Sequence, residues 1–253
     1  MGNTDVIDYK IIGDDMQAVI ITLDQGEAVR AEAGAMLFMS DGIEMETSTG
    51  GGVMAGLKRA IDGESFFITT FKSATPKSEV AFAAPYPGKI IPLDLRALGG
   101  TMLCQRDSYL CSAKGIEVSV AFTKRLGAGF FGGEGFILQK LSGDGLAFVH
   151  AGGAIHKLTL GPGQSLRVDT GCLVAFQPSV GYDIQLVGGI KTALFGGEGL
   201  FFARMTGPGD VWVQTLPFSR MADRVMAASK FGGQREEVTR LPGMLGGLLG
   251  GDD

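Results

Sequence analysis

Two short sequence patterns recur three times along this chain and constrain its fold more than any other feature. The first is a Gly-Glu pair followed by an apolar run, found as GESFFITTF from Gly63, GEGFILQKL from Gly133 and GEGLFFARM from Gly197. The second lies upstream of it each time, as AGAMLFM around Gly34, GGTMLCQ around Gly100 and TGCLVAF around Gly171. Two patterns that keep the same order three times predict three diverged copies of one unit of roughly 65 to 70 residues.

The copies are expected to consist of short strands. The chain contains 41 glycines, which suit tight reversals between strands far better than long helices. We therefore predict an all-β fold with a single domain over residues 1–231. It holds three repeats at about 5–92, 93–160 and 161–216 and one short helix at 217–231, and a flexible Gly/Leu-rich tail follows at 232–253.

Turn signals predict a hairpin in each copy. In the third copy, GLFFARM is expected to pair with DVWVQTL across Thr206-Gly207-Pro208-Gly209. The equivalent reversals are Ser142-Gly143-Asp144-Gly145 in the second copy and SATPKS, before EVAFAA, in the first.

The late helix is predicted from its capping residues and its apolar face. It begins at Pro217 with a possible cap at Ser219, and its expected stop is the Gly232-Gly233 pair. One face carries Met221, Val225 and Met226.

Charge and cysteine content argue against several classes of function. A net charge of -5 and a pI of about 5.1 disfavour general nucleic-acid binding, which needs a basic surface. Cys104, Cys111 and Cys172 show no CxxC spacing, so we expect neither a disulfide framework nor a zinc site, and no cofactor. The first residues, MGNTDVIDYK, are not typical of a signal peptide, and no apolar run is long enough for a membrane span. We expect a cytoplasmic protein, with a peripheral membrane location as the alternative.

The run LKRAIDGESFFITTF from Leu57, the AGAMLFM segment and the later FGGEG pairs resemble the bacterial members of the altered-inheritance-of-mitochondria family, a group of unknown function with a mitochondrial namesake. The resemblance covers residues 5–225. It implies a β fold like that of the tryptophan RNA-binding attenuation protein, within the double-stranded β-helix group, and a symmetric homo-oligomer. It implies no activity.

Three repeated acids are the first candidate site. Glu64, Glu134 and Glu198 would occupy equivalent turns, where they could converge on a cation. The alternative is structural, because each carboxylate can instead accept hydrogen bonds from the amides of its own glycine-rich turn.

Basic residues beside the glycine-rich loops are the second candidate. Ammonium and guanidinium groups next to such loops could bind a phosphate or another anion. No loop completes a phosphate or dinucleotide motif, however. These residues are Lys58, Arg59, Lys124, Arg125 and Lys191.

No catalytic or metal-binding constellation stands out. His150 and His156 are the only two histidines, too few for a cupin-type metal cluster, and neither has an obvious nucleophile as a partner. Cys104 and Cys172 are predicted to be small buried apolar residues. Trp212 and the many phenylalanines lie in largely uncharged runs, which favours core packing or subunit contacts over base stacking.

The sequence therefore predicts a non-enzymatic oligomeric scaffold or interaction module, with a protein or a membrane surface as a further partner. The first alternative is a ligand- or RNA-binding protein that uses the basic residues. A weaker one is an enzyme or cation site built from the repeated glutamates. A function specific to this chain is expected where the copies differ, in the Gly50 to Gly56 loop, the His150 to His156 bend and the C-terminal tail.

Overall fold

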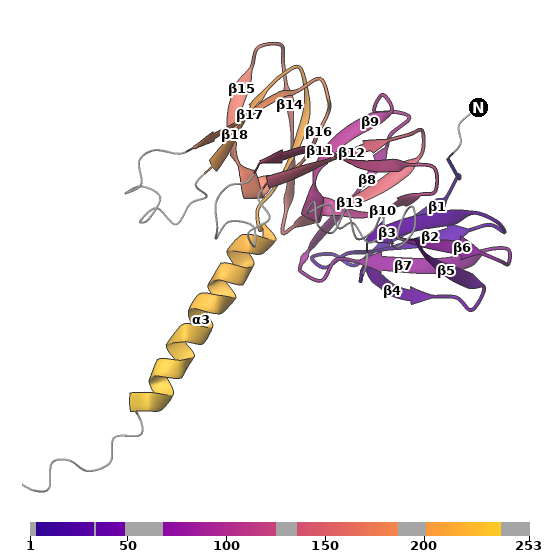
Figure 1. The fold of residues 1–253 in the computed structure, drawn as a ribbon, viewed down its shortest axis with the longest axis horizontal. Helices are drawn as coiled ribbons and strands as arrows, with labels where there is room; N and C mark the ends of the chain where they lie inside the picture. The colour runs from indigo at the N-terminus through magenta and orange to yellow at the C-terminus, as the bar shows by residue number, and fades with distance from the viewer. Residues whose placement is uncertain (1–3, 33, 49–67, 125–135, 187–200, 239–253) are drawn as a thin grey trace, which may run out of the picture. The chain divides into compact units, whose positions relative to one another are not determined.

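The computed structural model of the chain describes residues 4–32, 34–48, 68–124, 136–186 and 201–238. Within these ranges the chain forms four antiparallel sheets and one C-terminal α-helix (Figure 1). The predicted all-β fold with one late helix is confirmed. The chain divides into two compact units, Met1–Pro217 and Phe218–Asp253, and each is described by itself.

Two of the sheets are small. Sheet A has the order β1-β2-β7-β4, formed by β1 (Asp8–Ile12), β2 (Ala18–Leu23), β7 (Ser78–Ala83) and β4 (Met36–Met39). Sheet D has the order β15-β18-β17, formed by β15 (Ser165–Asp169), β18 (Phe201–Thr206) and β17 (Gly181–Leu186).

The other two sheets each have six strands. Sheet B has the order β5-β6-β3-β10-β13-β8, formed by β5 (Ile43–Ser48), β6 (Ile68–Ser73), β3 (Ala28–Glu32), β10 (Tyr109–Ala113), β13 (Leu146–Gly152) and β8 (Gly88–Asp94). Sheet C has the order β11-β12-β9-β16-β19-β14, formed by β11 (Glu117–Lys124), β12 (Phe136–Ser142), β9 (Thr101–Gln105), β16 (Leu173–Phe176), β19 (Gly209–Gln214) and β14 (Ile155–Leu160). Short 3-10 helices precede β10 and β16, namely η1 (Arg106–Ser108) and η3 (Thr170–Cys172).

The two six-stranded sheets have the same connectivity. Each strand of sheet C follows its counterpart in sheet B by six places along the chain, so that β3 beside β10 corresponds to β9 beside β16. One of the aligned sequence patterns does not fit this correspondence. AGAMLFM contributes β4 and TGCLVAF contributes β16, which pair with β7 and β19, whereas GGTMLCQ forms β9, which pairs with β12. The strand that pairs with β13 is β10, so the alignment at Gly100 is wrong.

The core follows from alternating apolar residues on the strands. In β2, Val19, Ile21 and Leu23 are fully buried, while Ile20 and Thr22 between them are partly exposed. Such a two-residue period places one face of the strand against the core. Phe71 of β6 and Phe82 of β7 meet edge to face in the first of three buried clusters, with ring centroids 5.2 Å apart. This contact joins sheet A to sheet B.

The three predicted hairpins are wrong in pairing, although the reversals themselves are present. β6 and β7, β12 and β13, and β18 and β19 follow one another along the chain, but the two members of each pair belong to different sheets. Gly143 and Gly209 occur in two of these turns with φ values of +151° and +142°, which disfavour other residues. A tight turn therefore redirects the chain from one sheet to another, and each strand finds its hydrogen-bonding partners elsewhere.

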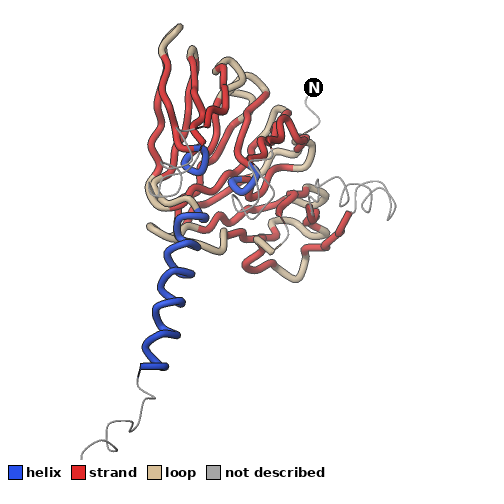
Figure 2. The backbone as a smooth tube through the Cα atoms, turned by 60° about the vertical axis from the view of Figure 1, so that its left-hand side comes forward, coloured by secondary structure: helices blue, strands red, loops and turns tan. Residues whose placement is uncertain are grey.

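The helix α3 (Phe218–Val238) is longer than predicted, because it continues past Gly232-Gly233. Each glycine costs the helix about 1 kcal/mol, but the following Gln-Arg-Glu-Glu run consists of strong helix formers. Figure 2 draws α3 as a long blue helix and the strands of the first unit in red. Val225 and Met226 of its predicted apolar face are exposed. No helix among the described residues is both long and apolar enough to cross a lipid bilayer.

Candidate functional site

The predicted acidic and basic sites fall almost wholly outside the described residues. Lys124 is the last residue of β11, and its side chain is not described. The other residues of these two predictions lie in the ranges that are not described, namely Lys58, Arg59, Glu64, Arg125, Glu134, Lys191 and Glu198. The proposed cation site and anion pocket therefore stay predictions. The Gly50 to Gly56 loop lies outside the described residues as well.

The two histidines lie in different sheets. His150 belongs to β13 of sheet B and is only 2% exposed, whereas His156 is an exposed residue of β14 in sheet C. The His150 ring packs edge to face on Tyr86, with ring centroids 4.6 Å apart. Burial lowers the pKa of His150 to about 4, so the imidazole is neutral near pH 7, and its Nδ1 atom has no hydrogen-bond partner.

Acidic groups lie near Tyr86. Burial, reinforced by the nearby Asp107 carboxylate and opposed by Arg106, raises the pKa of Glu32 to about 7. Burial, together with the charges of Asp107 and Glu32, raises the pKa of Tyr86 to about 12. Asp107 forms an ion pair with Arg106, whose Nε lies 3.3 Å from Asp107 Oδ1.

This cluster of Glu32, Tyr86, Arg106, Asp107 and His150 lacks an evident nucleophile. Burial raises the pKa of the Cys104 thiol to about 12, and the pKa of Cys111 is also raised by burial, so neither is a ready thiolate. In the part of the chain that the structure describes, no group of three or more histidine, cysteine or acidic side chains is arranged to hold a metal ion. Cys104 is buried, as predicted, but Cys172 is only partly buried.

The most unusual surface is the strand β4. Its four residues form an uninterrupted apolar run, and the exposed fractions of Met36, Leu37, Phe38 and Met39 are 38%, 56%, 42% and 38%. Every residue of β10 and β16, which hold the corresponding place in sheets B and C, is buried. β10 is covered by β3 and β16 by β9, whereas no described strand pairs with the outer edge of β4. An apolar edge strand of this kind is a template for pairing with another chain.

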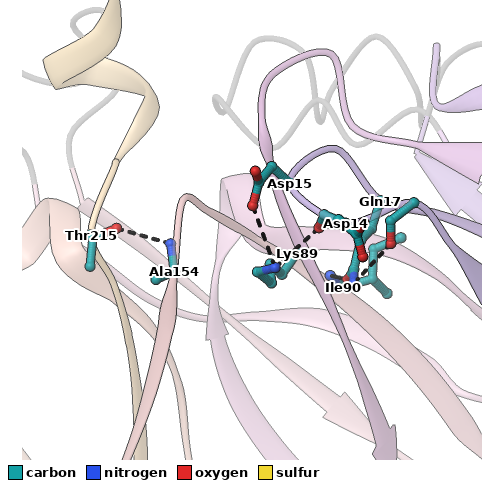
Figure 3. A network of polar contacts seen from close by, with 8 residues as sticks. Asp14, Asp15, Gln17, Lys89, Ile90, Ala154 and Thr215 are labelled. Atoms are coloured by element: carbon teal, nitrogen blue, oxygen red, sulfur yellow. Dashed lines mark hydrogen bonds and ion pairs between the residues drawn. The ribbon is translucent and has the colours of Figure 1, made fainter.

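Two other sheet edges carry polar or charged contacts. The segment before β2 lies against the edge of β8: Ile90 N donates to Gln17 Oε1 at 2.8 Å, and Lys89 Nζ donates to the carbonyl of Asp14 and pairs with Asp15 (Figure 3). The outer strand of sheet C, β14, carries the exposed Lys157, whose Nζ lies 2.8 Å from Asp210 Oδ2. β4 has no comparable charge.

The sequence itself contains a sign of this surface. AGAMLFM, which marks the repeat, also places four apolar residues in a row before Ser40 and Asp41. A half-buried strand normally alternates apolar and polar residues, so four consecutive apolar residues predict a strand covered on both faces. Here the described residues supply only part of that cover.

Comparisons with known proteins agree with the predicted resemblance. A family model described as mitochondrial biogenesis AIM24 matches residues 9–216. The uncharacterized protein M6_Spy0233 of Streptococcus pyogenes serotype M6 is 27% identical over 212 residues, which cover 81% of this chain and 83% of that protein. The crystal structure of protein SPYM3_0169 from Streptococcus pyogenes has a similar fold, with a TM-score of 0.74 and 23% identity over 88% of this chain and 99% of that one. The finer expectation of an attenuation-protein-like architecture stays a prediction. The family match spans nearly the whole strand-containing unit, and the chain belongs to the mitochondrial biogenesis AIM24 family.

Proposed function

We propose that this protein is a non-enzymatic scaffold that associates with other protein chains, first of all with copies of itself, through the strand β4. The observation that carries the proposal is the exposure of all four apolar residues of β4 on a strand whose outer edge is unpaired among the described residues. Main-chain groups of such an edge offer hydrogen bonds to an added strand, and the side chains supply apolar area.

The size of the apolar contribution supports association. Full burial of a Leu, Met or Phe side chain is worth about 1.5 to 3 kcal/mol, and each of the four residues of β4 already keeps part of its surface buried. Completing the burial of four such side chains, together with new main-chain hydrogen bonds, supplies free energy that opposes the entropy lost when two chains associate.

The proposal is tested by measuring the mass of the full chain with size-exclusion chromatography and light scattering. The wild-type protein is expected at a multiple of 26.5 kDa, the mass of one chain. Leu37→Asp places a charge on the most exposed residue of β4 and should shift the protein to the single-chain mass. A wild-type protein that stays monomeric at micromolar concentration contradicts the proposal.

A matched control uses another exposed apolar residue. Val225 of α3 is 65% exposed, and Val225→Asp introduces the same charge away from β4. This variant should keep the wild-type mass. If Val225→Asp dissociates the protein and Leu37→Asp does not, the association surface lies on the helix and the role of β4 is refuted.

A further inference from the structure

The strand pairings within one chain show how neighbouring repeats of this fold join, when the repeats are counted as β2–β7, β8–β13 and β14–β19. In sheet B, β3 pairs with β10 so that Ala31 lies opposite Cys111 and Arg30 opposite Ser112. In sheet C, β9 pairs with β16 so that Cys104 lies opposite Ala175 and Leu103 opposite Phe176. Both junctions are antiparallel. Each joins the second strand of one repeat to the third strand of the next repeat.

The strand β4 holds the same place as β10 and β16. All three pair on one side with the strand that follows a sheet-crossing turn, namely β7, β13 or β19. All three also have a register shift at the same point of that pairing. The shift lies between Met36 and Phe38 in β4, between Tyr109 and Cys111 in β10, and between Leu173 and Ala175 in β16. Phe38 therefore corresponds to Cys111 and Ala175, and Met39 to Ser112 and Phe176.

The strand β15 holds the place of β3 and β9. It pairs with β18 as β3 pairs with β6 and β9 with β12. Each of these three strands has five residues, and each ends with a polar residue, namely Glu32, Gln105 or Asp169. Val168 therefore corresponds to Ala31 and Cys104, and Arg167 to Arg30 and Leu103.

Sheets A and D therefore correspond to the two halves of a six-stranded sheet like sheets B and C. The order β2-β7-β4 from sheet A, followed by β15-β18-β17 from sheet D, reproduces the order of sheets B and C. Within one chain, β4 and β15 end different sheets, and no pairing between described strands joins them. We infer that β4 of one copy pairs antiparallel with β15 of a second copy, with Phe38 opposite Val168 and Met39 opposite Arg167.

Main-chain hydrogen bonds agree with this register. Ser40 N donates to Glu79 O of β7, so the N–H and C=O of the preceding Met39 point to the open side, because neighbouring residues of a strand face opposite edges. Gly207 N donates to Gln164 O, which places residues 164, 166 and 168 toward β18 and leaves Arg167 facing outward. Met39 and Arg167 can therefore exchange two hydrogen bonds. The same alternation holds at the junction of β10 and β3, where Lys114 N donates to Ala28 O.

The pairing is head to tail, since each copy contributes a different edge to each of its two contacts. A contact of this kind forms a closed ring when the rotation between copies returns to the start and a filament when it does not. The inference rests on the self-association proposed above and adds to it the two strands, their direction and their register.

Disulfide cross-linking between two single-cysteine copies tests the register. Met39→Cys in one preparation and Arg167→Cys in another are each combined with Cys172→Ser, because Cys172 is the one partly buried native thiol while Cys104 and Cys111 are buried. Opposed residues in antiparallel strands have Cα atoms about 5.5 Å apart or closer, within the range that a disulfide can bridge. Mixing and mild oxidation should give a dimer with one copy of each kind, absent from either preparation alone.

The matched control replaces Lys10, an exposed residue of β1 at the opposite edge of sheet A, with cysteine. Lys10→Cys mixed with Arg167→Cys should give no cross-linked dimer. A dimer of the Met39→Cys protein with itself would show a symmetric contact and overturn the inference. If the wild type is oligomeric and Leu37→Asp dissociates it, yet residues 39 and 167 do not cross-link, the proposed scaffold function stands and the β15 pairing is refuted.

A proline variant provides a second readout that does not depend on cysteine chemistry. The N–H of Met39 points away from β7, so Met39→Pro removes no bond within the chain and is compatible with an edge strand. It should lower the mass to 26.5 kDa with unchanged circular dichroism, whereas Met39→Val, which keeps the N–H, should remain associated. A folded Met39→Pro protein that retains the wild-type mass would refute the pairing.

Discussion

The strands β4 and β16 occupy the same place in their sheets and have opposite surroundings. Leu173, Val174, Ala175 and Phe176 of β16 are all buried in apolar clusters, and β9 and β19 flank the strand on both edges. Met36, Leu37, Phe38 and Met39 of β4 are as apolar, but among the described strands only β7 pairs with β4. The comparison indicates that strands at this place are built to be covered, and that described strands flank two of the three on both edges.

The largest expected effect comes from truncating one phenylalanine on each strand. Phe176 is fully buried and packs on Tyr182 with ring centroids 5.3 Å apart, so Phe176→Ala should lower the free energy of unfolding by about 3 to 5 kcal/mol. Phe38→Ala, made in the monomeric Leu37→Asp background, should lower it by less than about 1 kcal/mol because Phe38 is exposed. Urea unfolding measures both. Equal losses would mean that β4 is already covered within a single chain.

The second prediction concerns the loss of stability in acid caused by the buried histidine of β13. This strand pairs with β10 as β19 pairs with β16. At the position of His150, β19 carries Gln214, whose amide donates to Gly171 O and accepts from Gly152 N. Burial lowers the pKa of His150 from 6.5 to about 4, so the unfolded chain binds a proton more readily than the folded protein. The free energy of unfolding is therefore highest above pH 6.5 and falls as the pH approaches 4. The wild type should lose about 2 kcal/mol over this window, and His150→Gln should show a flatter profile.

The control for this prediction is His156→Gln, which replaces the other histidine of the chain, an exposed residue of β14. Urea midpoints recorded across the window should follow the wild type in this variant. If His150→Gln keeps the wild-type slope, His150 is not the group that makes the protein sensitive to acid.

The smallest effect on stability concerns the last residue of β3 and β9, the strands that pair with β10 and β16. This residue is Glu32 in β3 and Gln105 in β9. The pKa of Glu32 is raised from 4.5 to about 7, so ionising it in the folded protein weakens the fold as the pH rises from 4.5 to 7. Neighbouring groups desolvate the carboxyl group of Glu32, but the residue as a whole stays open to solvent, so screening should limit the gain from Glu32→Gln at pH 8 to under about 1 kcal/mol, with no gain at pH 5. Glu79→Gln, at an exposed acid of β7, serves as the comparison in thermal or urea unfolding. A similar gain in both variants would point to net charge as the cause.

The strands and turns of this fold were largely predictable from the sequence, but their partners were not. Ser142 to Gly145 and Thr206 to Gly209 do reverse the chain, as Gly, Asp and Pro in those positions predict. Whether the strands on either side pair with each other depends on contacts far apart in sequence, such as that of β12 with β9 or of β18 with β15. Local turn chemistry carries no information about those contacts.

The candidate site shows the same limit. The run Met36 to Met39 can be recognised as apolar, yet only the sheet order reveals that its outer edge is open. The cluster around His150 could not be found by spacing, because Glu32, Asp107 and His150 come from three distant segments. Conversely, the predicted acidic and basic site residues lie outside the described residues, except for Lys124, whose side chain is not described, so both sites stay predictions.

The burial of two cysteines has a practical consequence. Cys111 belongs to β10 and Cys104 to β9. One thiol is therefore enclosed where β3 pairs with β10, and the other where β9 pairs with β16. With their pKa values raised by burial, both thiols are unreactive while the strands stay paired. The chain thus contains two native chemical reporters of local opening, and the rate at which each is alkylated tells which junction separates first.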